Sequence, residues 1–226
     1  MVLTLLQFFC AAQRVIDVDK NVNLPANLFF SIGGEPVVNV KFVRLTSGSP
    51  FFKEQWMTAT GTSSTNLIYK GGTAKLNLLD NTIYFLDADG NERVVTTPLK
   101  EIVLTDTVTT NTYHFIHSSF LPNAVQRTWY LQLASGRTSL YQVFQKQLFE
   151  SKPYGSATTE QSIITRDLFF VLYNGQLSPV KKPKDLPAIL SDKKSELTEY
   201  LKKETSKSED IATQLATAIA YYNSLF

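Results

Sequence analysis

The sequence predicts a mainly β protein of the α+β class: an antiparallel meander sheet, curved or rolled into a partial barrel, with C-terminal helices packed on it. Three observations lead to this prediction. Short runs of alternating apolar and polar residues, separated by turn dipeptides, recur along the chain up to Val180. From Lys181 onward there is no glycine, and the apolar residues take helical spacing. The stretch 168–173, LFFVLY, is apolar on both faces, so a second layer has to cover it.

The stretch 73–97 has the clearest β pattern and predicts a three-stranded meander. Alternate residues from 74 to 78 are apolar, as in a strand with one buried face. Pro98 ends the third strand, because proline has no N–H to donate to the hydrogen-bond ladder. Two dipeptides that tolerate positive φ separate the strands and are typical of hairpin turns, Asp80-Asn81 and Asp89-Gly90.

Further strands are expected on both sides of this meander. The aromatic segment 51–56 should pack on the sheet as an anchor, whereas 61–65 is expected to be a turn. Asn174-Gly175, which follows the apolar stretch, predicts a tight hairpin. Turns or loops are also expected at 33–36, 118–126 and 151–156. The remaining strand candidates are 28–32, 37–45, 66–70, 99–104, 107–117, 127–133, 139–149 and 161–166.

After Lys181 the spacing predicts helices at 185–190 and 192–204, followed by a last helix. A capping box, Ser206-x-x-Glu209, is the expected start of that last helix. Leu197, Tyr200 and Leu201 fall on one face of the second helix. The apolar stripe expected on the last helix consists of Ile211, Leu215, Ala218, Ile219 and Tyr222.

The chain is expected to comprise a signal peptide at 1–12, an antiparallel β domain at 13–180 and a helical segment at 181–226 docked on that domain. The first region is a short apolar run that ends in Cys10-Ala11-Ala12, like a signal peptide before its cleavage site, but without the usual basic start. A buried N-terminal strand or helix is the alternative. Cys10 is the single cysteine, so cleavage after Ala12 would leave a chain without thiols or disulfides.

Composition bounds the classes of partner. With 226 residues and 43% hydrophobic content the chain can bury a sizeable core. The net charge is +2, from 22 basic and 20 acidic residues, and this near-balance gives no electrostatic argument for nucleic acid. After the first region no apolar run is long enough to span a membrane as a helix.

Four stretches carry a resemblance to a known family: GGEPVVNVKFV, GSPFFKEQWM, KLNLLDNTIYFLDADGNERVVTTPLKEI and ILSDKKSELTEYLKKE. Together they make the chain similar to an uncharacterised family of exported proteins of Bacteroidetes. The resemblance covers most of the chain, and its motifs consist of packing and turn residues. It implies an exported or cell-envelope location, and it implies no catalytic residue because the family has no assigned activity.

The candidates for metal or catalytic chemistry each have a simpler structural interpretation. His114 and His117 lie three apart on a predicted strand and therefore face opposite sides, so ordinary strand histidines are favoured over a shared metal. Three acids cluster at one turn of the meander, where they either hold a cation or cap backbone N–H groups. These acids are Asp87, Asp89 and Glu92.

Three further features have competing interpretations. The alternation Asp17, Asp19, Asn21, Asn23 is similar to the start of a calcium loop, but Val22 and Leu28 replace its glycine and glutamate, which favours a solvated loop. The basic cluster at 181–184 favours a solvated helix face over attraction to anionic lipid headgroups. Five aromatics, expected to fill a core rather than line a ligand groove, are Trp129, Tyr130, Tyr141, Phe144 and Phe149.

These observations favour a non-catalytic protein, exported to the periplasm, the outer-membrane surface or the extracellular space, that binds a protein partner or an apolar ligand. No cofactor, no metal and no catalytic residue is predicted, and membrane contact would be peripheral. Two alternatives stay open. One is a hydrolase whose carboxylates converge only in the folded chain. The other is a structural or assembly protein with an exposed sheet edge.

Overall fold

Twelve strands join in a single sheet in a computed structural model that describes residues 34–36, 43–155, 158–203 and 210–226. The strand order is β1-β6-β5-β4-β3-β7-β8-β9-β10-β11-β12, and β2 pairs with β11 beside that path. The strands are β1 (Gly34–Pro36), β2 (Val43–Ser47), β3 (Met57–Ser63), β4 (Ile68–Asn77), β5 (Thr82–Leu86), β6 (Glu92–Val95), β7 (Leu99–Thr105), β8 (Thr112–His117), β9 (Trp129–Ala134), β10 (Ser139–Ser151), β11 (Thr159–Tyr173) and β12 (Gln176–Val180).

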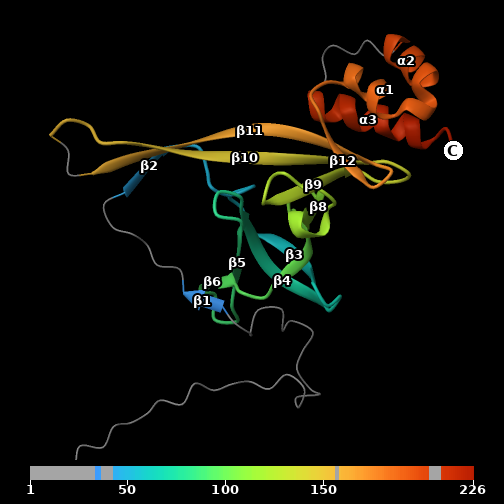
Figure 1. The fold of residues 1–226 in the computed structure, drawn as a ribbon. Helices are drawn as coiled ribbons and strands as arrows, with labels where there is room; N and C mark the ends of the chain where they lie inside the picture. The colour runs from blue at the N-terminus through green and yellow to red at the C-terminus, as the bar shows by residue number, and fades with distance from the viewer. Residues whose placement is uncertain (1–33, 37–42, 156–157, 204–209) are drawn as a thin grey trace, which may run out of the picture.

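The predicted fold class is confirmed, with one refinement of the sheet. Neighbouring strands on the main path are antiparallel, but β2 runs parallel to β11, so the sheet is mixed. The sheet is strongly curved and does not close into a barrel (Figure 1). Of the two shapes expected, the curved open sheet is therefore the one found.

The hairpin turns lie where the turn dipeptides predicted them. Asn81 and Gly90 have φ of 62° and 81° at the two turns of the meander, which is formed by β4, β5 and β6. Asn174 and Gly175 have φ of 48° and 75° between β11 and β12. Positive φ is costly for most residues and is tolerated by asparagine and glycine, so these turns set the register locally.

Several strand predictions need correction. The expected turn at 61–65 contains the end of β3, a central strand that pairs with both β4 and β7. Its sequence, MTATGTS, gives a weak strand signal because the inner face after Met57 has only the small residues Ala59, Gly61 and Ser63. The expected turn at 33–36 includes β1, which pairs with β6. The candidate 28–32 and most of 37–45 lie outside the described residues.

The concave face of the curved sheet encloses the first hydrophobic core. Buried side chains from β3, β4, β5, β7, β8 and β9 meet there, including Leu76, Phe85 and Phe115. Phe52, from the predicted aromatic anchor, closes this core by packing edge-on against Phe115, with their ring centroids 5.0 Å apart. The anchor prediction is therefore confirmed.

Three helices cover the continuation of this face over β9 to β12: α1 (Leu186–Ile189), α2 (Lys194–Lys203) and α3 (Ile211–Asn223) (Figure 1). Single 3-10 turns at 183–185 and 191–193 lead into α1 and α2. The predicted stripe of α3 is buried from Leu215 onward, whereas Ile211 is exposed. The N-cap of α3 is Asp210, whose carboxylate accepts from the backbone N–H of Thr213. Ser206 and Glu209, the predicted capping box, lie outside the described residues.

Both faces of the apolar stretch 168–173 are covered, as predicted. Phe169 and Val171 belong to the core beneath the helices. Phe170 belongs to a third cluster on the opposite face, together with Tyr130 and Tyr141. The segment between β8 and β9, which contains the 3-10 turn Ser118–Phe120, contributes Leu121 to that cluster. Burial of alternate residues on two sides explains why this strand has no polar face.

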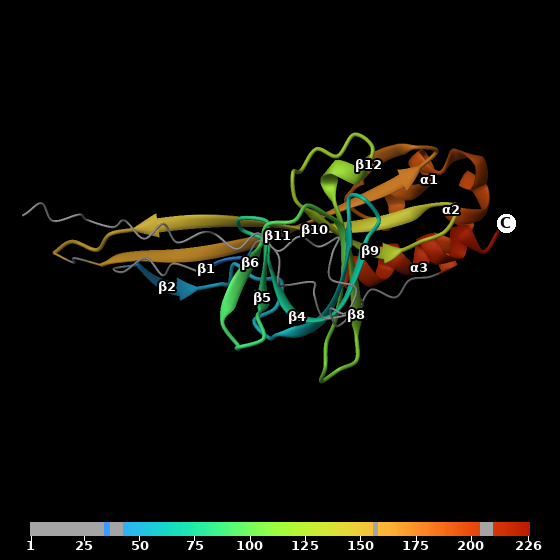
Figure 2. The ribbon, with the colours of Figure 1, turned by 90° about the horizontal axis from the view of Figure 1, so that it is seen from below.

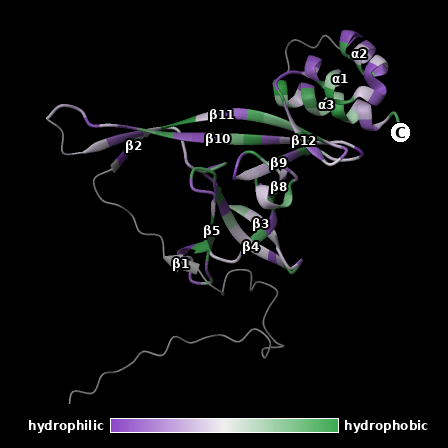
Figure 3. Cartoon of the chain, in the orientation of Figure 1, coloured by the Kyte–Doolittle hydropathy of each residue, from purple (hydrophilic) through white to green (hydrophobic). Residues whose placement is uncertain are grey.

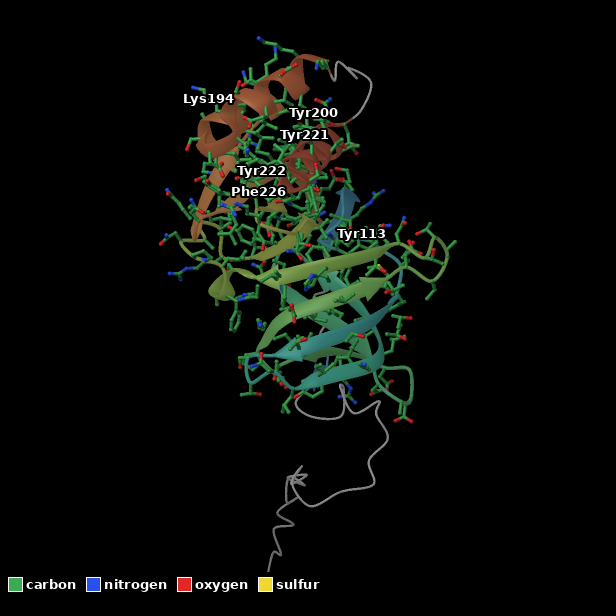
Figure 4. The ribbon with its side chains drawn as sticks, turned by 90° about the vertical axis from the view of Figure 1, so that its right-hand side faces the viewer. Tyr113, Lys194, Tyr200, Tyr221, Tyr222 and Phe226 are labelled. Carbon is green, nitrogen blue, oxygen red and sulfur yellow. The ribbon has the colours of Figure 1, made fainter. Side chains whose placement is uncertain are left out.

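Polar contacts also fix the helices on the sheet. Asn223, at the end of α3, accepts at Oδ1 from the Thr138 N–H and donates through Nδ2 to the Thr138 carbonyl oxygen, both at 2.9 Å. The Tyr222 hydroxyl donates to both carboxylate oxygens of Asp192, at 2.8 and 2.9 Å. Tyr200 of α2 stacks on Tyr221 of α3, with ring centroids 4.0 Å apart (Figure 4).

No helix among the described residues is long and apolar enough to cross a membrane.

Candidate interaction site

The distal parts of β10 and β11 leave the rest of the sheet and form a projecting arm, here residues 145–166. Figures 1 and 2 show the two strands extending away from the helices and from the curved part of the sheet. The register is continuous, from Ser139 opposite Leu172 to Ser151 opposite Glu160. The arm is therefore a regular extension of a hairpin whose base lies in the core.

The tip of the arm is a short turn with an aromatic side chain. It includes Pro153 and Gly155, and Gly155 has φ of 77°. Tyr154, between them, is fully exposed. The loop predicted at 151–156 is thus found at the point where the hairpin reverses, although residues 156 and 157 are outside the described part.

One edge of the arm is covered by β2. This strand pairs in parallel with β11 from Thr159 to Ser162. The Thr46 hydroxyl donates to the carbonyl oxygen of Gln161 at 2.8 Å. Gly48, at φ 77°, then crosses so close to Ile163 that a β-carbon there would overlap the Ile163 carbonyl oxygen. Glycine is required at position 48 because the backbone there has a positive φ and lies too close to the Ile163 backbone for a side chain.

The other edge of the arm is open. β10 pairs with β9 only from Leu140 to Gln142. Along Val143 to Ser151 no described strand pairs with the outer edge of β10, which is the outermost strand of the arm in Figure 2. Every second residue of an edge strand directs its backbone N–H and C=O outward, so this edge can accept a further strand.

Apolar side chains are exposed along the same stretch. Leu148 is 37% exposed and lies opposite Ile163, on the face of the arm that continues the concave face of the sheet. Phe149 (43%) and Ile164 (57%) are diagonal neighbours on the reverse face. Figure 3 shows this apolar part of the arm in green between more hydrophilic stretches. Adjacent exposed apolar side chains beside an open edge are typical of interaction sites.

Two opposite charges flank Leu148 on the same face of β10. Lys146 is half-buried near the base of the arm, and Glu150 is exposed near its tip. Burial lowers the pKa of Lys146, and the nearby carboxylates of Glu54 and Asp167 oppose this shift. Glu150 accepts a hydrogen bond from the Gln161 amide across the hairpin.

The two histidines face opposite sides of β8, as predicted. His114 is hydrogen-bonded through its ring nitrogens to Gln132 Oε1 at 3.0 Å and Glu101 Oε2 at 2.9 Å. Burial, the largest single effect, raises the pKa of Glu101, but the hydrogen bonds from His114 and Thr62 and nearby positive charge together outweigh it, so that the pKa is lowered overall. His117 packs edge-on against Trp129, and burial lowers its pKa. Each histidine has its own structural partners.

One of the three acids of the meander turn, Asp87, caps backbone N–H groups. Asp87 accepts from the backbone N–H of Asp89 at 3.0 Å and of Asn91 at 2.9 Å, and from Arg93 Nε at 3.0 Å. The bond from the Asn91 backbone is the main reason why the pKa of Asp87 is lowered. Asp89 and Glu92 are exposed at the same turn. Within the described ranges no three His, Cys, Asp or Glu side chains are grouped so as to hold a metal ion.

The remaining sequence candidates separate into core and surface. Trp129, Tyr130 and Tyr141 are buried and Phe144 packs on the first core, which confirms the core interpretation for four of the five aromatics. Phe149 is the exception, because it lies on the arm. The lysines 181, 182 and 184 are exposed. The calcium-like stretch from Asp17 to Asn23 lies outside the described residues.

A groove of about 580 Å³ lies at the base of the arm, beside the start of α3. It contains two carboxylates, Asp167 and Asp210. Asp210 is held by Thr213, whose backbone N–H and hydroxyl both donate to it at 2.9 Å. The other residues that line the groove are Gln142, Phe169, Lys181, Ile211 and Ala212.

The sequence did not lead us to expect the arm, although it contains a signal for it. In 145–152 and 158–167 apolar residues occur as two adjacent pairs, Leu148-Phe149 and Ile163-Ile164. Adjacent residues of a strand point to opposite faces, so each face of the arm receives few apolar side chains. A hairpin with two mainly polar faces has little apolar surface to bury on either side, which favours its projection from the body.

Comparisons with protein-family models, with curated proteins and with solved structures find no match to this chain.

Proposed function

We propose that this is a non-catalytic, exported protein that binds a protein partner by adding a strand of the partner to the open edge of β10. The observation that supports this most directly is the edge from Val143 to Ser151, which lacks a strand partner and lies beside exposed Leu148 and Phe149. Added strands bind through backbone hydrogen bonds, and alternate side chains supply specificity. Export is supported by the apolar N-terminal run and by the family resemblance.

The proposal unites two of the alternatives that the sequence left open, a partner-binding protein and an assembly protein with an exposed edge. Strand addition does not require a deep cavity, and the arm projects from the body so that a partner can approach it (Figure 2). A hydrolase is the second candidate, and its specific support is the pair Asp167 and Asp210 in one groove. Asp210 already has a structural role as the N-cap of α3, which favours strand addition over hydrolysis.

Site-specific photo-crosslinking in the cell that produces the protein tests the partner-binding proposal. A photoreactive phenylalanine analogue at position 149 or 164 should form covalent adducts with a protein. The same analogue at Val108 and Val125, which are apolar and more exposed than the arm positions but lie on loops of the body, is the control. Adducts that form no more often at the arm positions than at these two controls would rule out the arm as the partner site.

A further inference from the structure

We infer that the strand added to β10 is β10 of a second copy of this chain, paired antiparallel about a two-fold axis at Leu148. The inference rests on the proposed function and names the partner. A closed two-fold dimer uses the same surface on both copies, so the edge must complement itself. The sequence of the edge, from Val143 to Ser151, can therefore be examined for self-complementarity.

The geometry of an antiparallel pair restricts the registers. Opposite residues have side chains on the same face, and a two-fold axis perpendicular to the sheet keeps each residue on its face. A residue can therefore lie opposite itself or opposite a residue an even number of positions away. If at least five residues of each edge are to pair, the axis must pass through one of five residues, from Gln145 to Phe149.

Charge selects one of these five registers. With the axis at Leu148, Lys146 of each copy lies opposite Glu150 of the other, which places two opposite-charge pairs across the edge. With the axis at Phe149, Lys146 would lie opposite Lys152, the residue that follows the edge. With the axis at Lys146, the two Lys146 side chains of the dimer would lie opposite each other. The two axes at Gln145 and Gln147 create no pair of opposite charges.

The same register joins the apolar residues. Leu148 lies opposite Ile163 within each hairpin. With the axis at Leu148, one row would cross both hairpins in the order Ile163, Leu148, Leu148 and Ile163. Each neighbouring row would contain one Lys146 and one Glu150. An apolar row with a charge pair on each side is the pattern that stabilises cross-strand pairing.

The charges also explain why the edge would not pair with arbitrary strands. A lysine on an edge strand discourages pairing, because an apolar partner would place no carboxylate directly opposite it and would bury it further. Lys146 gains a carboxylate directly opposite it, in addition to the nearby Glu54 and Asp167, when the partner presents an acid at the position that Glu150 has in this strand. Lys146 and Glu150 thus oppose other partners and favour a second copy.

Sedimentation of the purified full chain tests the dimer. We expect a monomer–dimer equilibrium at concentrations up to about 100 μM. Glu150→Lys should weaken the dimer by about tenfold or more, because it creates two like-charge pairs. The combined variant Lys146→Glu/Glu150→Lys should restore dimerisation, because it exchanges the two charges. Lys152→Glu is the charge control, because Lys152 lies near the tip and outside the two Lys146–Glu150 pairs. It should weaken the dimer less than Glu150→Lys does.

Cysteine cross-linking tests the register. In a Cys10→Ser background, Leu148→Cys should form a disulfide-linked dimer under mild oxidation, because the two cysteines face each other across the axis. Gln147→Cys and Phe149→Cys should not, because each would be offset from its own copy by two residues, roughly 8 Å between Cα atoms, which is too far for a disulfide. Equal cross-linking at all three positions would contradict the Leu148 axis.

The outcomes separate this inference from the function on which it rests. A chain that stays monomeric in sedimentation, or a dimer that Glu150→Lys does not weaken, overturns the second copy as partner. Photo-adducts from the arm with a different protein would then still support partner binding. Adducts of twice the chain mass, together with a disulfide at position 148, support both. Absence of arm-specific adducts and of the dimer overturns both.

Discussion

Asp106 is a buried carboxylate that joins two distant parts of the chain. Its side chain is 2% exposed and accepts from the backbone N–H groups of Val108 and Thr109, at 2.9 and 3.1 Å. Lys53 Nζ lies 3.3 Å from it and also donates to the Tyr113 hydroxyl at 2.7 Å. The turn between β7 and β8 is thereby tied to the segment that carries the aromatic anchor.

This carboxylate should make the protein sensitive to acid. Hydrogen bonds from Val108 and Thr109 hold the pKa of Asp106 well below its ordinary value of 3.8, and they outweigh desolvation, which raises it. Because the pKa is depressed in the folded state, the stabilisation is complete above the ordinary value and is lost as the pH falls below it. Asp106→Asn should lower the melting temperature near neutral pH and reduce its further fall in acid. Melting curves at about pH 6 and pH 3 check this, and parallel losses in both proteins would contradict it.

Gly48 is the residue on which the covered edge of the arm depends. Gly48→Ala should destabilise the protein by at least about 1–3 kcal/mol, because it adds an unfavourable positive φ and a clash with the Ile163 carbonyl oxygen. Gly90→Ala is the matched control, since Gly90 has a similar φ of 81° and no atom within 4 Å of an added β-carbon. Urea unfolding of both variants gives the comparison. An equal loss in the two variants would show that the contact with Ile163 is unimportant.

At the scale of elements, α3 is the helix that supplies most of the cover over the second core. Leu215, Ala218, Ile219 and Tyr222 are buried on its inner face. A helix of this length is marginal alone in water, so its stability comes from docking on β9 and β10. The polar contacts of Asn223 with Thr138 fix its end against the turn between these strands.

Truncation of one side chain of α3 measures this docking. Leu215 is fully buried, so Leu215→Ala should lower the free energy of unfolding by about 2–5 kcal/mol through lost burial and a residual cavity. Thr217→Ala, on the exposed face of the same helix, should change it by less than about 0.5 kcal/mol. Denaturant titrations of both variants provide the measurement. Similar small effects would mean that α3 is an appendage.

The elements that could be predicted from the sequence are those whose signals are local. The meander and the hairpin at Asn174-Gly175 depend on turn residues that need positive φ, and the helices depend on apolar spacing. The strand β3 was missed because tertiary position, at the centre of the sheet, overrides its weak intrinsic pattern. The candidate site was missed for a related reason. Phe149 has the same local pattern as core aromatics, and only the pairing of β10 with β11 beyond the core places it on the surface.

At the scale of the molecule, the two cores on the concave face are parts of one packed unit. Leu133 of β9 packs against both the core within the curved sheet and the core beneath the helices. β9 supplies Trp129 and Leu131 to the first core, and its neighbour β10 supplies Leu140 to the second. Loss of either core would therefore remove the support of strands that the other core needs.

This sharing predicts that the β domain and the helical segment unfold together. Trp129 is buried in the first core, so its fluorescence reports on the curved sheet, whereas each helical residue contributes more strongly than a strand residue to circular dichroism near 222 nm. In a urea titration the two signals should change with the same midpoint, as in a two-state transition. Trp56→Phe would leave Trp129 as the single tryptophan and keep the fluorescence signal unambiguous. If the helical signal were lost at a lower urea concentration than the fluorescence change, the segment 181–226 would be a separate unit and the shared strands would not couple the two cores.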